Sequence, residues 1–261
     1  MLGSAKLSGM AGHTATFGDR FSMVKAARGS TKRGSKALYY PMSPPNNDNY
    51  NPGCPFYVLC NLPMCKEDEY WKTVAMLEKT VSKTGRAAIT KETGISCMPL
   101  CAASHAFCHP SFFLIDPFHI LYENCASFQW DTWTQSSPSD SIHLHADIAC
   151  EFGKAVSEAI STLPAAFCGP VRDPFLKHQS QYEIYEWMAL VHWYILSIGI
   201  ELGFPSAVLK SFSLFVKIVN ASMTIRSWSE PELQQLLIVI EAFTILTNKF
   251  SCHNKRVSDG I

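Results

Sequence analysis

Apolar residues recur at steps of three and four positions along most of the chain after residue 65, which is the period of an amphipathic α-helix. The pattern predicts helices over residues 66–84, 116–133, 148–163, 179–202, 206–224 and 230–250. The sequence Ser229-Glu230-Pro231-Glu232 has the form of a capping box and indicates where the last helix begins. We therefore expect a mainly α protein, built as a helical bundle.

Short apolar runs near residues 95–115 differ from this helical pattern. The clearest is Phe112-Phe113-Leu114-Ile115, and an uninterrupted apolar run of that length is typical of a buried strand. We expect at most two or three short strands, all of them in this region.

Composition divides the chain into three parts. Residues 1–65 are basic and rich in Gly and Pro and show no sustained period, so we expect a poorly ordered N-terminal segment and connector. Residues 66–250 are expected to form a mostly helical domain. Residues 251–261 are polar, and we expect a frayed tail.

Charge is balanced overall but unevenly distributed. Lys plus Arg and Asp plus Glu both number 22, so net charge indicates no partner. The first 40 residues are nevertheless basic, and their cations could contact DNA phosphates without reading the base sequence. The candidate DNA-binding residues are Arg20, Lys25, Arg28, Lys32, Arg33 and Lys36. The alternative is a solvated tail, which basic runs commonly form.

Cysteine usage and hydropathy limit the expected location. The chain has ten cysteines without a CxxC pair and opens with no secretory signal pattern, so we expect reduced thiols in a nuclear or cytoplasmic protein that is not secreted. The longest uncharged apolar run, residues 187–200, is shorter than the roughly 20 residues of a membrane-spanning helix. We therefore expect no membrane partner.

A Cys/His-rich stretch offers soft metal ligands at Cys97, Cys101, His105, Cys108 and His109. Structural zinc sites usually combine a closely spaced Cys pair with a second pair farther along the chain, whereas these residues all lie within one short stretch. Buried thiols and histidines with local hydrogen bonds are therefore favoured over a metal site.

Asp116 and His119 lie three residues apart where a helix is predicted to begin, so they share one face of its first turn. The pair could act as an acid and a base. The structural alternative is that Asp116 caps the helix, with its side-chain oxygen accepting a hydrogen bond from the amide two or three residues on. His119 would then be a core histidine whose ring nitrogens are satisfied locally.

Further short motifs follow one another along the chain. They are Lys6-Leu7-Ser8-Gly9-Met10-Ala11-Gly12-His13, Tyr39-Tyr40-Pro41, Thr93-Gly94-Ile95, Asp116-Pro117-Phe118-His119 with Tyr122-Glu123-Asn124, Trp133-Thr134 and Thr162-Leu163-Pro164-Ala165-Ala166-Phe167, before a Glu- and Trp-containing helix near residue 186. In order and spacing they resemble the CACTA-type (En/Spm-like) transposase family of DNA transposons. The resemblance covers nearly the whole chain, and the Asp-x-x-His element is its most specific part.

The resemblance implies a ribonuclease H-like core, of which this chain would keep a small α/β remnant. It also implies an acidic Asp, Asp and Glu triad that cuts and joins DNA with two divalent metal ions. Mg²⁺ suits that chemistry because it prefers oxygen ligands and polarises the attacking and leaving oxygens of a phosphodiester. Asp116 and His119 match the family's Asp-x-x-His pair. The final Glu falls on Glu186, with Glu183 as the alternative.

In the family, the first two catalytic Asp residues precede the segment that matches Lys6 to His13, whereas here no acidic residue occurs before Asp19. We therefore expect a truncated, catalytically inactive transposase-derived protein that itself holds no metal or other cofactor. DNA and a full-length transposase are the partners this implies. The alternatives are a nuclear DNA- or protein-binding module that uses the basic N-terminal region and, thirdly, a helical protein of the membrane surface.

Overall fold

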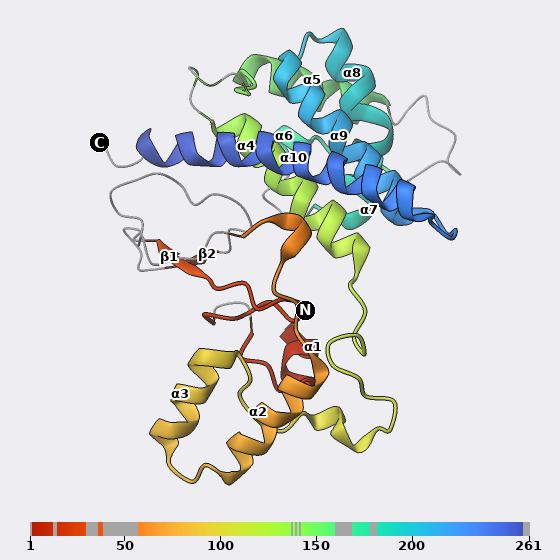
Figure 1. Ribbon diagram of the computed structural model, residues 1–261. Coiled ribbons are helices and arrows are strands. Elements are labelled where there is room, and N and C mark those ends of the chain that lie inside the picture. The colour runs from red at the N-terminus through yellow and green to blue at the C-terminus, as the bar shows by residue number, and fades with distance from the viewer. Residues whose placement is uncertain are drawn as a thin grey trace. The chain divides into compact units, whose positions relative to one another are not determined.

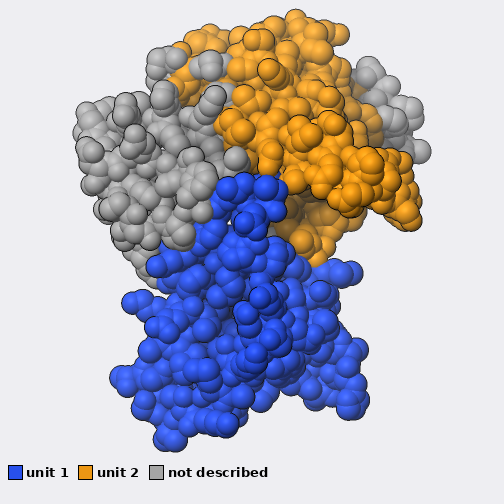
Figure 2. All heavy atoms as spheres, viewed as in Figure 1, with its two compact units in different colours: residues 1–114 blue, residues 115–261 orange. Residues whose placement is uncertain are grey.

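The computed structural model resolves the chain into two compact units, residues 1–114 and residues 115–261 (Figures 1 and 2). The residues described are 2–12, 15–29, 36–38, 57–136, 138, 140, 142–159, 169–177 and 182–257. The boundary between the units falls at residue 114, not at the predicted boundary near residue 65, because residues on both sides of position 65 share one hydrophobic core.

Unit 1 (residues 1–114) is organised around two helices, α2 (Glu67–Lys79) and α3 (Lys83–Thr93) (Figure 1). Three acidic residues occupy the first turn of α2, where the helix dipole favours negative charge. Apolar residues at three- and four-residue steps then face the core, and they include Val74 and Leu77. The side chain of Ser82 accepts a hydrogen bond from the Gly85 amide and begins α3.

The smaller elements of unit 1 are α1 (Leu2–Leu7), two 3-10 turns and one hairpin. The 3-10 turns are η1 (Leu59–Asn61) and η2 (Leu100–Ala103). Strand β1 (Ala27–Gly29) pairs antiparallel with β2 (Lys36–Leu38), so that Arg28 lies opposite Ala37 and Gly29 lies opposite Lys36.

The N-terminal residues belong to the core of unit 1. Gly9, with φ at 67°, accepts hydrogen bonds at its carbonyl from the amide (2.7 Å) and hydroxyl (2.9 Å) of Ser96, and Met10 forms a bridge with Ile95. The hydroxyl of Tyr70 donates to the carbonyl of Ser8 over 2.7 Å. Weak order was predicted for residues 1–65, but Ser8 and Met10 have fixed partners, because they pack against the aromatic side chain of Tyr70 on α2. Residues 39–56, most of the predicted connector, lie outside the described residues.

The strands predicted near residues 95–115 are absent from the described structure of that region, apart from the isolated bridge at Ile95. The prediction of a buried strand over residues 112–115 is wrong. Leu114 is 84% exposed, and the segment is a turn followed by irregular backbone. No described strand lies beside this run to form a sheet with it, and its backbone bonds locally instead: the Phe112 amide donates to the Cys108 carbonyl over 2.7 Å.

Unit 2 (residues 115–261) is built from helices (Figure 1). A π-helix, η3 (Phe118–Ala126), continues directly into α4 (Ser127–Gln135). Next come α5 (Ala146–Ala159) and the short α6 (Pro174–Lys177). A continuous helical run then comprises α7 (Ile184–Ala189), the π-helical turn η5 (Leu190–Tyr194) and α8 (Ile195–Glu201). Finally α9 (Ser206–Met223) leads to α10 (Glu230–Val257), which extends past the predicted end at residue 250.

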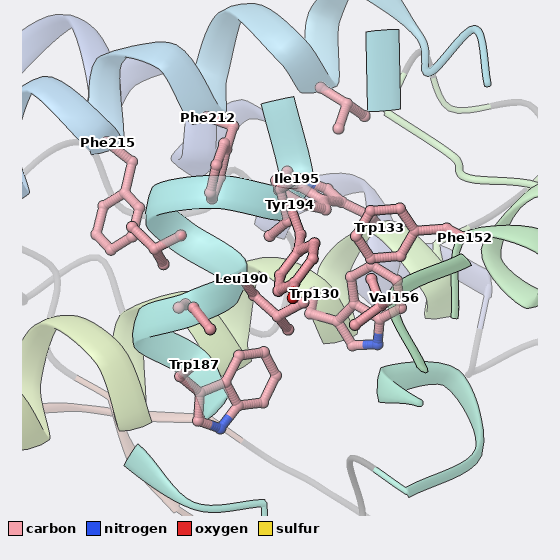
Figure 3. Close-up of a cluster of buried hydrophobic side chains, with 14 of the residues drawn as sticks. Trp130, Trp133, Phe152, Val156, Trp187, Leu190, Tyr194, Ile195, Phe212 and Phe215 are labelled. Atoms are coloured by element: carbon pink, nitrogen blue, oxygen red, sulfur yellow. The ribbon is translucent and has the colours of Figure 1, made fainter. Parts of the chain in front are cut away.

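Large aromatic side chains from several of these helices form the core of unit 2 (Figure 3). Trp130 of α4 lies 5.4 Å from Phe152 of α5 between ring centres. Trp133 meets Phe212 of α9 edge to face at 5.5 Å. Phe243 of α10 stacks on Phe215 of α9 at 5.6 Å. These contacts join α4, α5, α9 and α10.

The prediction of a mainly helical protein is confirmed, since strands in the described residues are limited to β1 and β2. A ribonuclease H-like remnant stays a prediction. Among the described residues, no helix is both long enough and apolar enough to cross a membrane.

The core contacts of Phe152 predict a large effect of its truncation. Phe152 is fully buried between Trp130 and Phe204, so Phe152→Ala is expected to lower the free energy of unfolding of unit 2 by about 3–5 kcal/mol. Urea titration followed by tryptophan fluorescence measures this, because five of the six tryptophans lie in unit 2. Leu176→Ala, at a position 69% exposed, is the control and should change stability by less than about 0.5 kcal/mol. Equal effects of the two substitutions would contradict the packing described.

Candidate functional site

Asp116 lies at the entrance to η3 and caps it. Its Oδ1 accepts hydrogen bonds from the amides of Phe118 at 3.0 Å and His119 at 3.3 Å. These amides have no carbonyl partner one turn earlier, so the carboxylate supplies what the helix start lacks. The capping role predicted for Asp116 is confirmed.

His119 lies between two carboxylates. Its Nδ1 is 2.6 Å from Oδ2 of Asp116, and its Nε2 is 3.4 Å from Oε2 of Glu123. The three side chains are about half exposed, at 48–50%, so the prediction of a core histidine is wrong. Hydrogen bonds from the amide and the ring of His119 hold the pKa of Asp116 below its ordinary value.

Glu123 was not predicted as a partner of His119. The signal was present, because residues four apart on a helix face one another, and the sequence contains His119 and Glu123 at that spacing. When protonated, His119 can donate to both carboxylates. When neutral, it has one donor and can serve only one of them.

The π-helical segments η3 and η5 are joined by a hydrogen bond of 2.8 Å between the Tyr122 hydroxyl and Nε2 of His192. Tyr122 is 1% exposed. Burial lowers the pKa of His192 and raises that of Tyr122, so both groups are held neutral. The pair links η3 to η5 inside the unit, behind the exposed Asp116 and His119.

Glu186 is completely buried and its carboxylate accepts four hydrogen bonds. Oε1 accepts from the Arg172 amide at 3.0 Å and from Nε of Arg172 at 2.8 Å. Oε2 accepts from the terminal guanidinium nitrogen of Arg172 and from the Glu183 amide at 2.8 Å. Burial by itself would raise the pKa of Glu186, but the bonds from Arg172 and Glu183 outweigh it and hold this pKa below its ordinary value.

Among these bonds, the one from the Glu183 amide belongs to a capping box at the start of α7, in which Glu183 and Glu186 each bond to the other's backbone. Tyr182 adds to the network, because its hydroxyl donates to the Arg172 carbonyl over 2.9 Å and its ring lies 5.5 Å from the guanidinium. Sequence reasoning missed Arg172, which is fourteen positions from Glu186 and falls in a predicted turn.

Asp116 and Glu186 therefore have their carboxylate oxygens occupied by the protein itself. A divalent ion needs oxygen ligands with free lone pairs, and binding at Glu186 would require displacing a guanidinium that donates to both of its oxygens. Within the described part of the chain, no group of three His, Cys, Asp or Glu side chains is placed to hold a metal ion. As arranged, these residues do not fit a two-metal site, and a catalytic role for Glu186, Asp116, His119 or the alternative Glu183 stays a prediction.

The predicted DNA-binding residues fall into two groups. Lys25 is exposed immediately before the β1–β2 hairpin, which carries Arg28 and Lys36. Lys32 and Arg33 lie outside the described residues, in the segment that joins the two strands.

Arg20 is placed differently from the hairpin residues. Its guanidinium lies over the rings of Phe21, at 4.7 Å, and Phe113, at 5.9 Å, and donates to the Leu114 carbonyl. Burial lowers its pKa. Arg20 is therefore a packing residue of unit 1, less available to a phosphate than a solvated side chain would be.

The Cys/His-rich stretch is divided between surface and core. Cys97 and Cys108 are exposed, so the prediction of buried thiols is wrong for both. The Cys108 thiol donates to Oε2 of Glu67, and this contact raises its pKa. His109 is buried and stacks on Tyr70 at 4.0 Å, and burial lowers its pKa to about 4. His109 is thus a neutral core residue that stacks on an aromatic ring.

The chain matches no family model, no curated protein and no solved structure.

The hydrogen bonds around Glu186 predict that its substitution lowers the stability of the protein and that the size of this effect depends on pH. Glu186→Gln removes the charge that Arg172 is paired with, so we expect the free energy of unfolding to fall by about 2–4 kcal/mol at pH 7. The pKa of Glu186 is lowered in the folded protein, so its stabilising contribution is present above the unfolded-state pKa of about 4.3 and is lost as pH falls through the folded-state pKa.

Urea titrations of both proteins between pH 7 and pH 3 measure this effect. The difference between wild type and Glu186→Gln should shrink as the pH decreases below about 4.3. Glu201→Gln, at an exposed position of α8, serves as the matched control and should stay within about 0.5 kcal/mol of wild type. A difference that is constant over this pH range would show that the ionised form of Glu186 does not contribute.

Proposed function

We propose that the protein derives from a CACTA-type DNA transposase and acts without phosphodiester chemistry. The ordered series of motifs from Lys6 to Glu186 supports the ancestry. The observation that carries the absence of catalysis is the state of Glu186, whose buried carboxylate accepts four hydrogen bonds, three of them from Arg172.

The chemistry explains why this observation matters. Two-metal catalysis requires carboxylates that face the substrate and hold ions beside the scissile phosphate. A carboxylate inside a helical core, neutralised by a guanidinium, cannot take part unless the helix start is rebuilt. One carboxylate oxygen of Asp116 accepts from two amides and the other contacts His119, so both oxygens already have protein partners and are poorly placed to bind a metal ion.

A second candidate function is DNA binding through the basic N-terminal region, in the nucleus and with DNA or a full-length transposase as partner. The observation that favours it is the position of Lys25, Arg28 and Lys36 on and beside one hairpin, whose connecting segment carries Lys32 and Arg33. Basic residues that follow one another closely on such a segment can contact successive phosphates. Binding of this kind is compatible with the first proposal, since it needs no metal and no acidic triad.

The non-catalytic proposal predicts that the purified chain does not cleave DNA. With Mg²⁺ or Mn²⁺ and a duplex carrying transposon ends, strand breaks should not exceed those of a protein-free control. Labelled substrates resolved on denaturing gels provide the measurement. Metal-dependent cleavage that disappears in both Asp116→Asn and Glu186→Gln, with folding of each checked by circular dichroism, would overturn the proposal.

The DNA-binding proposal predicts a salt-dependent affinity that depends on five cations. We expect a dissociation constant on the order of 10⁻⁴–10⁻⁶ M for a random duplex near physiological salt, rising steeply with salt concentration. Changing Lys25, Arg28, Lys32, Arg33 and Lys36 together to Gln should reduce the slope of log K against log salt by up to about 4.5, since each phosphate contact contributes about 0.9. Fluorescence anisotropy with a labelled duplex measures both quantities.

A charge-matched control separates this effect from that of net charge. Unit 1 also carries five exposed lysines on or beside α2 and α3, namely Lys66, Lys72, Lys79, Lys83 and Lys91. Changing these to Gln removes the same number of cations from another surface and should leave most of the affinity and slope in place. Equal losses in the two variants would mean that the hairpin is not the DNA-binding surface.

A further inference from the structure

The β1–β2 hairpin of unit 1 has two faces, and the backbone pairing assigns its residues to them (Figure 1). Residues directly opposite each other on antiparallel strands share a face, whereas successive residues of one strand alternate between the faces. The register pairs Ala27 with Leu38, Arg28 with Ala37 and Gly29 with Lys36. Lys36 is therefore on the same face as Ala27 and Gly29, and Arg28 is on the opposite face together with Ala37.

The segment before β1 continues this alternation and shows which face is exposed. Val24 and Ala26 are buried, at 5% and 7% exposed, whereas Lys25 between them is exposed. Alternate burial is the two-residue period of an extended chain, so Lys25 is on the face of Lys36, which we call the lysine face. The two buried residues are on the opposite face, with Arg28.

Backbone hydrogen bonds hold this segment in unit 1. The Lys25 amide donates to the hydroxyl of Tyr57 over 3.0 Å, and the Ala26 amide donates to the carbonyl of Thr16 over 2.7 Å. Rotating the strand about its axis would break both bonds and would bring the two buried side chains into water. The lysine face and the opposite face are therefore two distinct surfaces, of which the one with Lys25 is exposed.

The spacing and charge of the lysine face suit a nucleic-acid backbone. Lys25 precedes Gly29 by four residues, or roughly 13 Å at about 3.3 Å per residue, and Lys36 lies directly opposite Gly29. Both lysines therefore fall well within one turn of duplex DNA, which is about 34 Å long. The sequence contains no Asp or Glu between Asp19 and Asp48, so the hairpin contributes no carboxylate that would repel a phosphate.

We propose that duplex DNA docks on the lysine face alone, with Lys25 and Lys36 contacting phosphates of the same duplex. Arg28 continues the face of the buried Val24 and Ala26, so it contributes little to this contact. The proposal rests on the DNA-binding function proposed above and adds to it the side of the hairpin from which DNA approaches.

Two alanines of the hairpin allow a matched test. Ala27 is on the lysine face and Ala37 on the opposite face, so Ala27→Lys and Ala37→Lys add the same charge to opposite sides of one hairpin. Ala27→Lys should steepen the slope of log K against log salt by about 0.9 and strengthen binding by up to roughly eightfold in about 0.1 M salt. Ala37→Lys should change the affinity by less than about twofold, because salt screens a charge on the far side of the hairpin. Fluorescence anisotropy of the full chain with a labelled duplex measures both quantities.

Removal of single charges gives the converse test. Lys25→Gln and Lys36→Gln should each reduce the slope by about 0.9 and weaken binding by up to roughly eightfold in about 0.1 M salt. Arg28→Gln removes the same charge from the other face and should weaken binding by less than about twofold. Circular dichroism checks that each variant is folded.

The outcomes separate the failure of this proposal from that of DNA binding itself. Equal gains in Ala27→Lys and Ala37→Lys, or equal losses in Arg28→Gln and the two lysine variants, would overturn the assignment of the face. Binding by the hairpin would still stand in that case, provided that the variant without all five basic residues loses affinity. If the wild-type chain shows no salt-dependent affinity for the duplex, both proposals fail.

Discussion

The ion pair of Glu186 with Arg172 is the constraint on which the arrangement of unit 2 depends. A buried carboxylate without partners would be too costly to keep ionised, and here four donors surround it. Three of them come from one residue outside the helix, so the pair fastens the turn at Arg172 to the first turn of α7. This contact fixes the rotation of the helical run over residues 184–201 about its axis. The rotation in turn determines which side chains of the run face the aromatic core, namely Trp187, Leu190 and Ile195.

The Asp-x-x-His element has a structural role at the start of η3. Asp116 caps η3, and His119 joins it to Glu123 at the surface. Beneath them Tyr122 reaches His192, so the start of η3 is tied to a second π-helical turn. π-helical turns are uncommon, and they often occur where a function has constrained a helix. The structure therefore accounts for these residues without a metal ion, while their spacing keeps the resemblance to the transposase motif.

Unit 1 depends on contacts that join distant parts of the chain. Gly9 can approach the backbone at Cys97 only because it has no side chain: a Cβ atom there would lie 2.3 Å from the carbonyl oxygen of Cys97. The N-terminal residues are thus held against the loop after α3, beside Tyr70 and His109. Arg20 is used in the same unit to cover Phe21 and Phe113, which removes it from the group of cations around the hairpin.

The sequence by itself determined the local features of this protein. The three- and four-residue period of apolar residues located the major helices, and the acidic residues of its first turn indicated where α2 begins. Asp116 was identified as a helix cap. These features could be predicted because each depends on neighbours within one or two helical turns. Only the tertiary structure decided which residues meet across the chain. Phe112 to Ile115 has the pattern of a strand but no strand to pair with. Glu186 matched the catalytic Glu of the transposase family, and only the structure shows that a guanidinium fourteen residues away occupies its carboxylate. Such partners carry no periodic signal, because their contact depends on how the helices pack and not on their spacing in the chain.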